Sequence, residues 1–161
     1  MDDVQFFPVP ELGDGVVSLR LSECVPHRKG NWAPAYHFFA YLPGLYHPIG
    51  HIHLRIGMNE DLFYGGHIGY GVQEPYRGHG YARRFCLLVP PVARSHGMEE
   101  LIITTTSDNL PSLRTIEALG ATYLGESKIP RKSELYARGM RYVCRYVWDI
   151  SAYPPYLITG P

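Results

Sequence analysis

Apolar and polar positions follow a strand-like pattern along four segments of the first half of the chain, each bounded by turn residues. The predicted strands are Val16–Cys24, Ala35–Leu42, Ile49–Ile56 and Gly66–Gln73. In the third strand, the alternation places His51 and His53 on one face. Ile52 and Leu54 then lie on the opposite face.

Two segments of the second half have apolar residues at helical spacing. The first, His79–His96, contains the pair Pro90-Pro91, and we expect a kink or a break there because each proline removes a backbone donor. The second begins after Asn109, a residue type that caps helices, and ends at Gly120. Its predicted apolar face is made of Leu110, Leu113, Ile116 and Leu119.

Three further strands are predicted around these helices, at Leu101–Thr106, Ala121–Ser127 and Met140–Ile150. The first of them is short and apolar, of the kind that lies centrally in a sheet. At 161 residues the chain suits one domain with a sizeable core, which we take as residues 1–161. The lead-in 1–14 and the tail 151–161 are expected to be irregular.

Charge and cysteine content exclude several classes of protein. Lysine plus arginine and aspartate plus glutamate number 15 each, so the net charge gives no general attraction to nucleic acid or to an anionic membrane. No apolar run approaches the roughly 20 residues that cross a bilayer, and the acidic start of the chain predicts no secretion signal. The 3 cysteines match no zinc-site spacing, so we expect reduced thiols in a cytoplasmic protein.

The stretch Tyr76–Ala82 has the features of an anion-binding turn. It follows the glycine-spaced strand Gly66–Gln73 and precedes a helix, whose first amides have no partner and lie at the positive end of the helix dipole. Gly78 and Gly80 allow the backbone to approach an anion closely. The sequence contains neither the G-x-x-x-x-G-K-[ST] motif of triphosphate sites nor the dinucleotide motif G-x-G-x-x-G.

Two motifs in this region resemble those of one superfamily. Arg77-x-x-Gly80-x-Ala82 resembles the pyrophosphate signature of the GNAT acyl-CoA-dependent N-acetyltransferases, in which Gln or Arg is followed by two residues, Gly, one residue, and Gly or Ala. The helix that starts with Asn109-Leu110-Pro111-Ser112 and ends with Leu119-Gly120-Ala121 resembles the family's Asn-led helix at about the expected distance downstream.

The resemblance implies an α/β (α+β) fold with a single mixed, mostly antiparallel seven-stranded sheet, splayed between its fourth and fifth strands. Acetyl-CoA would lie in the splay, and no metal is expected. Backbone groups near Gly71 and Val72 would pair with the pantetheine arm, and the loop amides would hold the pyrophosphate. The cofactor-binding residues implied by the resemblance are Gly71, Val72, Arg77, Gly78, His79, Gly80, Tyr81, Ala82, Asn109 and Ser112.

The general base and the proton donor are less well defined by the sequence. His67 and Glu74, at the two ends of the strand before the loop, are the candidate bases, and the loop residues Glu60 and Asp61 are further candidates. Many family members carry a tyrosine on the Asn-led helix to protonate the leaving thiolate, but Ile116 stands there in this chain. Tyr81, Ser112, Tyr123 or solvent would have to replace it.

The acceptor side also departs from the family pattern. The family has two helices between its first two strands, whereas only the segment Val25–Pro34 is available here. We therefore expect an open acceptor groove, which a second subunit in a homodimer could complete. The strand face that carries His51 and His53 has a competing interpretation as a zinc site, with His37 and His47 nearby.

Two functions of different classes follow from these observations. The first is an N-acetyltransferase that moves an acetyl group from acetyl-CoA to a primary amine of a small molecule or peptide by direct attack. The second is a non-catalytic acyl-CoA-binding module, which Ile116 and the missing acceptor walls favour. Turnover distinguishes the two.

Overall fold

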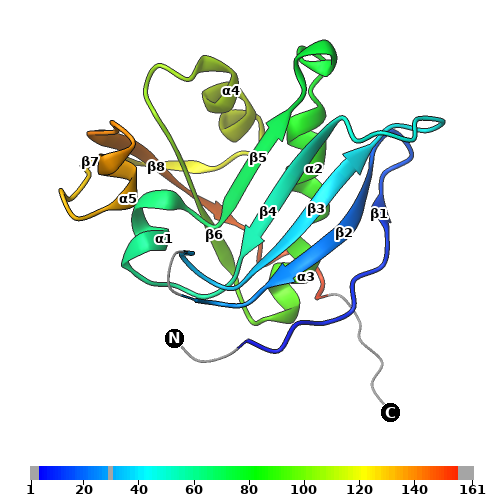
Figure 1. Ribbon diagram of the computed structural model, residues 1–161, viewed down its shortest axis with the longest axis horizontal. Coiled ribbons are helices and arrows are strands. Elements are labelled where there is room, and N and C mark those ends of the chain that lie inside the picture. The colour runs from blue at the N-terminus through cyan, green and yellow to red at the C-terminus, as the bar shows by residue number, and fades with distance from the viewer. Residues whose placement is uncertain (1–3, 29–30, 156–161) are drawn as a thin grey trace.

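The strands form two antiparallel sheets in the computed structural model, which describes residues 4–28 and 31–155. The larger sheet has the strand order β1 (Leu12–Gly13), β2 (Ser18–Val25), β3 (Ala35–Tyr41), β4 (Gly50–Arg55) and β5 (Ile68–Val72). In the smaller sheet, β8 (Tyr142–Asp149) lies between β6 (Glu100–Thr105) and β7 (Thr122–Lys128). Figure 1 shows the two sheets meeting at β5 and β6.

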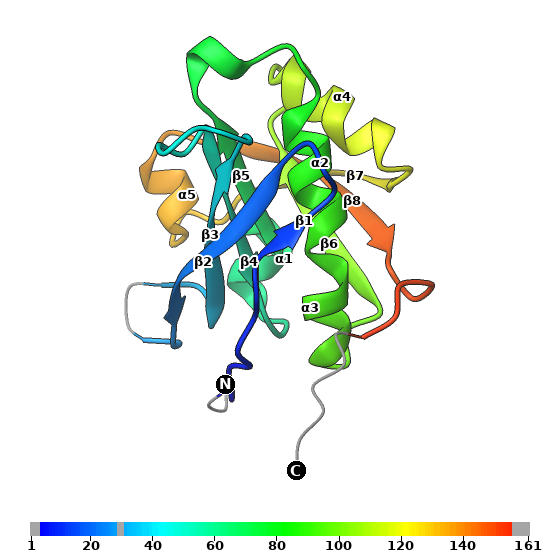
Figure 2. The same cartoon turned by 90° about the vertical axis from the view of Figure 1, so that its right-hand side faces the viewer.

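Five α-helices and one 3₁₀ turn connect the strands of the described chain. They are α1 (Glu60–Gly65), η1 (Glu74–Tyr76), α2 (Tyr81–Leu88), α3 (Pro90–Ser95), α4 (Leu110–Ala118) and α5 (Glu134–Ala137). Figure 2 shows α2 and α3 following one another along one face of the larger sheet, with α4 beside α2. The opposite face of β3 and β4 carries the histidines considered below.

The predicted splay is confirmed at the expected place, because the ladder of paired strands stops after β5 and restarts at β6. The strand count differs from the prediction by β1, which lies within the lead-in that we expected to be irregular. Leu12 and Gly13 pair with Leu19 and Ser18 across a turn at Gly15, where φ is +88°. The strand has only two residues, too few to show a pattern of alternation.

The predicted position of Leu101–Thr106 needs a correction. The corresponding strand, β6, is an edge strand of the smaller sheet and not a central one. Leu101, Ile102 and Ile103 are nevertheless buried, with 0%, 6% and 1% of their surface exposed. Contacts of β6 with β5, α1 and α4 supply the cover that a second paired strand would have given.

The segment that holds Glu60 and Asp61, which we expected to be a loop, forms the helix α1. Asn59 caps it by accepting a hydrogen bond from the Leu62 amide at 2.9 Å, and Gly66, with φ of +78°, ends it. The helix has six residues and only Leu62 is buried, so no helical period is visible in the sequence. The short helix α5 was missed for the same reason.

The predicted interruption at Pro90-Pro91 is confirmed. Both prolines occupy the first turn of α3, where an amide has no intrahelical acceptor and its loss costs little. Val89 keeps a helical conformation between α2 and α3, and its side chain is completely buried. The core lies between these helices and the larger sheet and includes Phe85 and Ile116, each 0% exposed. In contrast to the predicted apolar face of α4, Leu110 is 56% exposed.

His67 joins the two sheets at the splay. Its backbone amide donates to the Ile102 carbonyl at 2.7 Å, and its ring accepts a hydrogen bond from the Ile102 amide through Nδ1 at 2.8 Å. Nε2 donates to the Gly57 carbonyl at 2.7 Å. The side chain is 3% exposed, and burial lowers the pKa of the imidazole below its ordinary value. His67 is thus a neutral, buried link between the start of β5, β6 and the segment that precedes α1.

We expect His67→Ala to lower the free energy of unfolding by about 2–4 kcal/mol, because it leaves a buried amide and a buried carbonyl without partners. The unfolded chain binds a proton at His67 more readily than the folded chain, so this contribution is present above about pH 6.5 and decreases as the pH falls. Urea unfolding at several pH values measures both effects. His79→Ala, at an exposed histidine, is the control and should change stability by less than about 0.5 kcal/mol.

Candidate functional site

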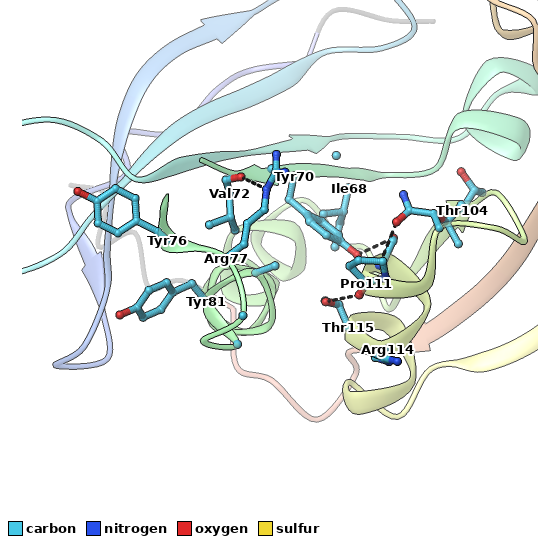
Figure 3. Close-up of a pocket in the computed structure, with 18 of the residues that line it drawn as sticks. Ile68, Tyr70, Val72, Tyr76, Arg77, Tyr81, Thr104, Pro111, Arg114 and Thr115 are labelled. Carbon is cyan, nitrogen blue, oxygen red and sulfur yellow. Dashed lines mark hydrogen bonds between the residues drawn. The ribbon is translucent and has the colours of Figure 1, made fainter. Parts of the chain in front are cut away.

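A cavity of about 810 Å³ surrounds the edge strand β5 at the splay. Its wall comes from β5, the loop that follows it, α2, the end of β6 and the start of α4 (Figure 3). Because β5 has no paired neighbour on this side, the cavity reaches both faces of the strand. It touches Tyr70 and Val72 on one face and Gly69 and Gly71 on the other.

The loop before α2 exposes its backbone to this cavity. Gly78 and Gly80 have φ values of +87° and +74°, a conformation that favours glycine, and a Cβ at either position would meet no atom within 4 Å. The first amides of α2 have no intrahelical acceptors. The loop and the helix start therefore form an open cradle of donors with positive potential, suited to an anion.

Most of the residues expected to bind the cofactor line this cavity. They are Gly71, Val72, Arg77, Gly78, Gly80, Tyr81, Ala82, Asn109 and Ser112. The exception is His79, whose exposed side chain lies outside the lining and contacts the Tyr81 ring at 5.5 Å between centroids. Arg77 turns back on the preceding strand, since its Nε donates to the Val72 carbonyl at 2.8 Å (Figure 3). One acceptor site of that carbonyl is therefore already used.

Asn109 caps the helix α4 at the cavity. Its Oδ1 accepts a hydrogen bond from the Ser112 amide at 3.3 Å, which is the predicted cap. Arg114 also lines the cavity. Two other arginines that could have added charge near an anion face elsewhere, because Arg84 pairs with Asp14 at 2.9 Å and Arg83 donates to the Ala118 carbonyl at 3.4 Å.

Tyr70 is a site residue that the sequence reasoning missed. It reaches from β5 toward α4, where its hydroxyl lies 3.1 Å from the Ser112 hydroxyl (Figure 3). Burial raises the pKa of this phenol to about 12, so the group is neutral and able to donate a proton at pH 7. The two glycines that flank Tyr70 were a signal of close approach, but the sequence does not show which helix the ring would face.

The candidates for a proton donor differ in whether they line the cavity. Ile116 is fully buried in the core, so the helix position used for a tyrosine in the family points away from the cavity. Tyr81 and Ser112 line the cavity. Tyr123 is 54% exposed on β7 and lies outside the lining.

The bases predicted from the sequence are not at the cavity. Both ring nitrogens of His67 are bonded to backbone groups, so a role as base requires one of these hydrogen bonds to break. Glu74 is exposed in η1, outside the lining, and its role stays a prediction. Glu60 and Asp61 lie in the first turn of α1 and not in a loop, and Glu60 pairs with Lys132 at 3.4 Å.

Three histidines form a cluster on the open face of the larger sheet. The rings of His37 and His53 stack at 3.6 Å between centroids, and His51 lies 5.2 Å from His53. Burial lowers the pKa of each ring, that of His53 to about 4, so the cluster is neutral at pH 7. His47 lies apart and pairs with Tyr76 at 2.8 Å. The described residues include no group of three potential ligands placed to hold a metal ion.

His51 lies beside the cavity across the β4–β5 ladder. It pairs with Gly71, and a Cβ at Gly71 would come within 2.8 Å of its ring. Glycine at this position therefore leaves room for the imidazole next to the backbone that the resemblance assigns to the pantetheine arm.

Comparison with known proteins agrees with this architecture. A family model described as an acetyltransferase (GNAT) domain matches residues 19–122. Among solved structures, ribosomal-protein-S5-alanine acetyltransferase from Vibrio fischeri matches with a TM-score of 0.57 and 22% identity over 75% of this chain and 64% of that protein. Mycobacterium smegmatis RimJ, solved with CoA-disulfide, matches with a TM-score of 0.56 and 17% identity over 74% of this chain and 55% of that protein.

A third match is yncA from Salmonella typhimurium, solved with acetyl-CoA, with a TM-score of 0.54 and 16% identity over 77% of this chain and 70% of that protein. The chain thus spans less than two thirds of the length of the first two structures. A search of curated proteins finds no match. No helix in the described part of the chain has the length and apolar character needed to cross a bilayer.

Proposed function

The chain belongs to the GNAT acetyltransferase family, and from this premise we propose that it transfers an acetyl group from acetyl-CoA to a primary amine of a small molecule or peptide. One observation carries the proposal. The open backbone of Gly78 and Gly80 at the start of α2 faces the same cavity as the Asn109-capped end of α4. A loop suited to an anion and a cavity beside it, both at the splay between the sheets, support the proposal.

The residues present fit the donor substrate. The amides from Gly78 to Ala82 would hold its pyrophosphate, because no side chain fills the space above the two glycines. Arg77 and Arg114 would add positive charge, and Asn109 and Ser112 would contact the donor from α4. The backbone of Gly71 would orient the arm that carries the acetyl group. These roles, including that of His79 through its amide, are parts of the proposal.

Acetyl-CoA supplies the activated acetyl thioester. In the transfer, the amine nitrogen forms a bond with the carbonyl carbon, the carbon–sulfur bond breaks, the amine loses a proton and the sulfur gains one. An amine with a pKa near 10.4 is unprotonated at pH 7 only at a cost of about 4.6 kcal/mol, so a proton acceptor assists the reaction.

Two side chains are placed for these proton transfers. His51 is neutral at pH 7 and lies against Gly71, outside the cavity lining, and would accept the amine proton there. Glu74 stays a candidate acceptor from outside the cavity lining. Tyr70, neutral and paired with Ser112, would protonate the sulfur in place of the helix tyrosine.

The proposal also includes the setting in which the enzyme works. Cys24, Cys86 and Cys144 are free thiols, which fits the reducing cytoplasm. The described part of the connection between β2 and β3 contains no helix, so the acceptor face is open. A homodimer would cover it with a second copy.

A non-catalytic acyl-CoA-binding module is the second candidate, favoured by the core position of Ile116 and the open acceptor face. Calorimetry with CoA combined with thiol release from acetyl-CoA across an amine panel tests both functions. We expect saturable binding and acceptor-dependent release of one thiol per acetylated product. Binding without transfer to any amine supports the module, and absence of CoA binding contradicts both functions.

A further inference from the structure

Arg55 lies at the opposite end of β5 from the anion cradle. It sits on β4, and its guanidinium stacks on the Trp32 ring with the central carbon 4.5 Å from the ring centroid. Burial lowers the pKa of this group to about 10, so it is charged at pH 7. Within residues 4–28 and 31–155, no carboxylate forms an ion pair with it. The site thus contains a positive charge that the described chain does not neutralise.

Part of the guanidinium has a structural use. Nη1 donates to the carbonyls of Gly65 and Gly66, at 3.4 and 3.0 Å, at the end of α1. Nη2 instead lies over Gly69, where an added Cβ would come within 3.0 Å of it. No described acceptor bonds Nη2. The described chain has no fully buried side-chain nitrogen without a partner, so Nη2 is accessible, and Arg55 lines the cavity. The hydrogen bonds to the end of α1 therefore explain the position of Nη1 but not that of Nη2.

Arg55 and Trp32 form the boundary between the main cavity and a second cavity of about 200 Å³. At roughly 30 Å³ per water molecule in the liquid, this volume suits a small group. Arg138, His37 and His53 also line it. Its acidic lining residue, Glu134, is already paired with Arg138 at 2.6 Å and accepts from Trp32 Nε1 at 3.2 Å. The second cavity is therefore suited to a negative group and not to a second ammonium.

The spacing of residues along β5 sets the distance between the Arg55 charge and the proposed position of the acetyl group. Gly69 and Gly71 lie on one face of the strand, two residues and so roughly 7 Å apart. Gly71 is where the acetyl group would be oriented, and Arg55 covers Gly69. An acceptor whose amine reaches the position at Gly71 would therefore place a group a few bonds away next to Arg55.

We propose that Arg55 recognises a carboxylate on the acceptor, so that the substrate is a small amino acid or similar amine-bearing acid. This inference rests on the proposed acetyltransferase function and names its substrate class. A planar guanidinium binds a carboxylate with two parallel hydrogen bonds, and Trp32 holds the plane of the guanidinium in place. Polyamines, which carry a second positive charge in place of the acid, would be repelled by Arg55.

The test compares amino acids with the amines that lack their carboxylate, such as alanine with ethylamine and 4-aminobutanoate with propylamine. We expect wild-type kcat/KM to favour the acid, and Arg55→Met to lower the acid-to-amine ratio by 10- to 100-fold while CoA affinity is kept. Because each ratio is compared between wild type and variant, differences in the intrinsic reactivity of the amines cancel.

Two additional variants keep the test valid if Arg55→Met does not fold. Gly69→Ala crowds Nη2 without a strained backbone and should also lower the ratio. Thr122→Ala, on β7 and outside both cavities, is the control and should leave it within threefold. A ratio unchanged within threefold in folded Arg55→Met overturns the role of Arg55 and leaves the acetyltransferase proposal intact.

A separate outcome concerns the underlying function. If CoA binds but no amine is acetylated, the acetyltransferase proposal fails, and Arg55 is then judged by calorimetry with N-acetylalanine and N-ethylacetamide in the presence of CoA. Tighter binding of N-acetylalanine that Arg55→Met removes supports carboxylate recognition. Equal binding of the two compounds contradicts it.

Discussion

Gly80→Ala is expected to weaken CoA binding by at least thirtyfold, or about 2 kcal/mol. The new methyl group would meet no protein atom within 4 Å, so it projects into the space above the start of α2. That space is where the proposed pyrophosphate accepts hydrogen bonds from the loop amides. Loss of one or more charge-assisted hydrogen bonds is enough to produce an effect of this size. Calorimetric titration with CoA measures it.

The substitution also strains the backbone, since φ at Gly80 is +74°, and this costs stability by about 1–2 kcal/mol. Gly97→Ala is a matched control. Gly97 has φ of +80°, a Cβ there also meets nothing within 4 Å, and the residue follows α3 outside the cavity lining. Both variants should therefore lose similar stability, and only Gly80→Ala should lose CoA affinity. Equal CoA affinity of the two variants would show that the loop does not hold the phosphates.

Tyr70→Phe is expected to lower kcat by about 100-fold, within the range typical of general acid catalysis. The change removes only the hydroxyl that lies 3.1 Å from Ser112 Oγ, so the ring continues to fill the space between β5 and α4. CoA affinity should stay within threefold of wild type. Because the pKa of Tyr70 is about 12, the wild-type rate should show no loss from its ionisation up to about pH 10.

Tyr123→Phe removes a hydroxyl from an exposed tyrosine outside the cavity and should leave kcat unchanged. Tyr81→Phe tests the other candidate proton donor among the tyrosines that line the cavity. A kcat within threefold of wild type for Tyr70→Phe, together with a large loss for Tyr81→Phe, would assign the proton donor to Tyr81.

Local patterns were sufficient for most of the framework. The alternation in β2 to β5, the prolines at the start of α3 and the cap at Asn109 each depend on residues within a few positions of one another. Such signals survive in a single sequence because they reflect local sterics and hydrogen bonding. The short elements β1, α1 and α5 were not predicted, because segments of two to six residues show no hydrophobic period.

His67 shows why the chemistry was harder to predict. From the sequence it was a histidine at a strand end with a suitable pKa. In the fold it is buried between Gly57 and Ile102, and Ile102 lies 35 positions away along the chain. Tyr70 was not a candidate from the sequence, but the fold brings its hydroxyl to Ser112 across the splay. Burial and long-range partners decide whether such groups are free to transfer protons.

The sequence by itself determined the anion cradle, because Gly78, Gly80 and the start of α2 are consecutive and their geometry is local. The resemblance of its motifs to the family also implied where the sheet splays, between β5 and β6. Only the tertiary structure decided what stands at the other end of the cavity. Arg55, Trp32 and Gly69 come from separate segments, and side chains that converge from separate segments are positioned by packing, which the spacing of residues along a chain does not reveal.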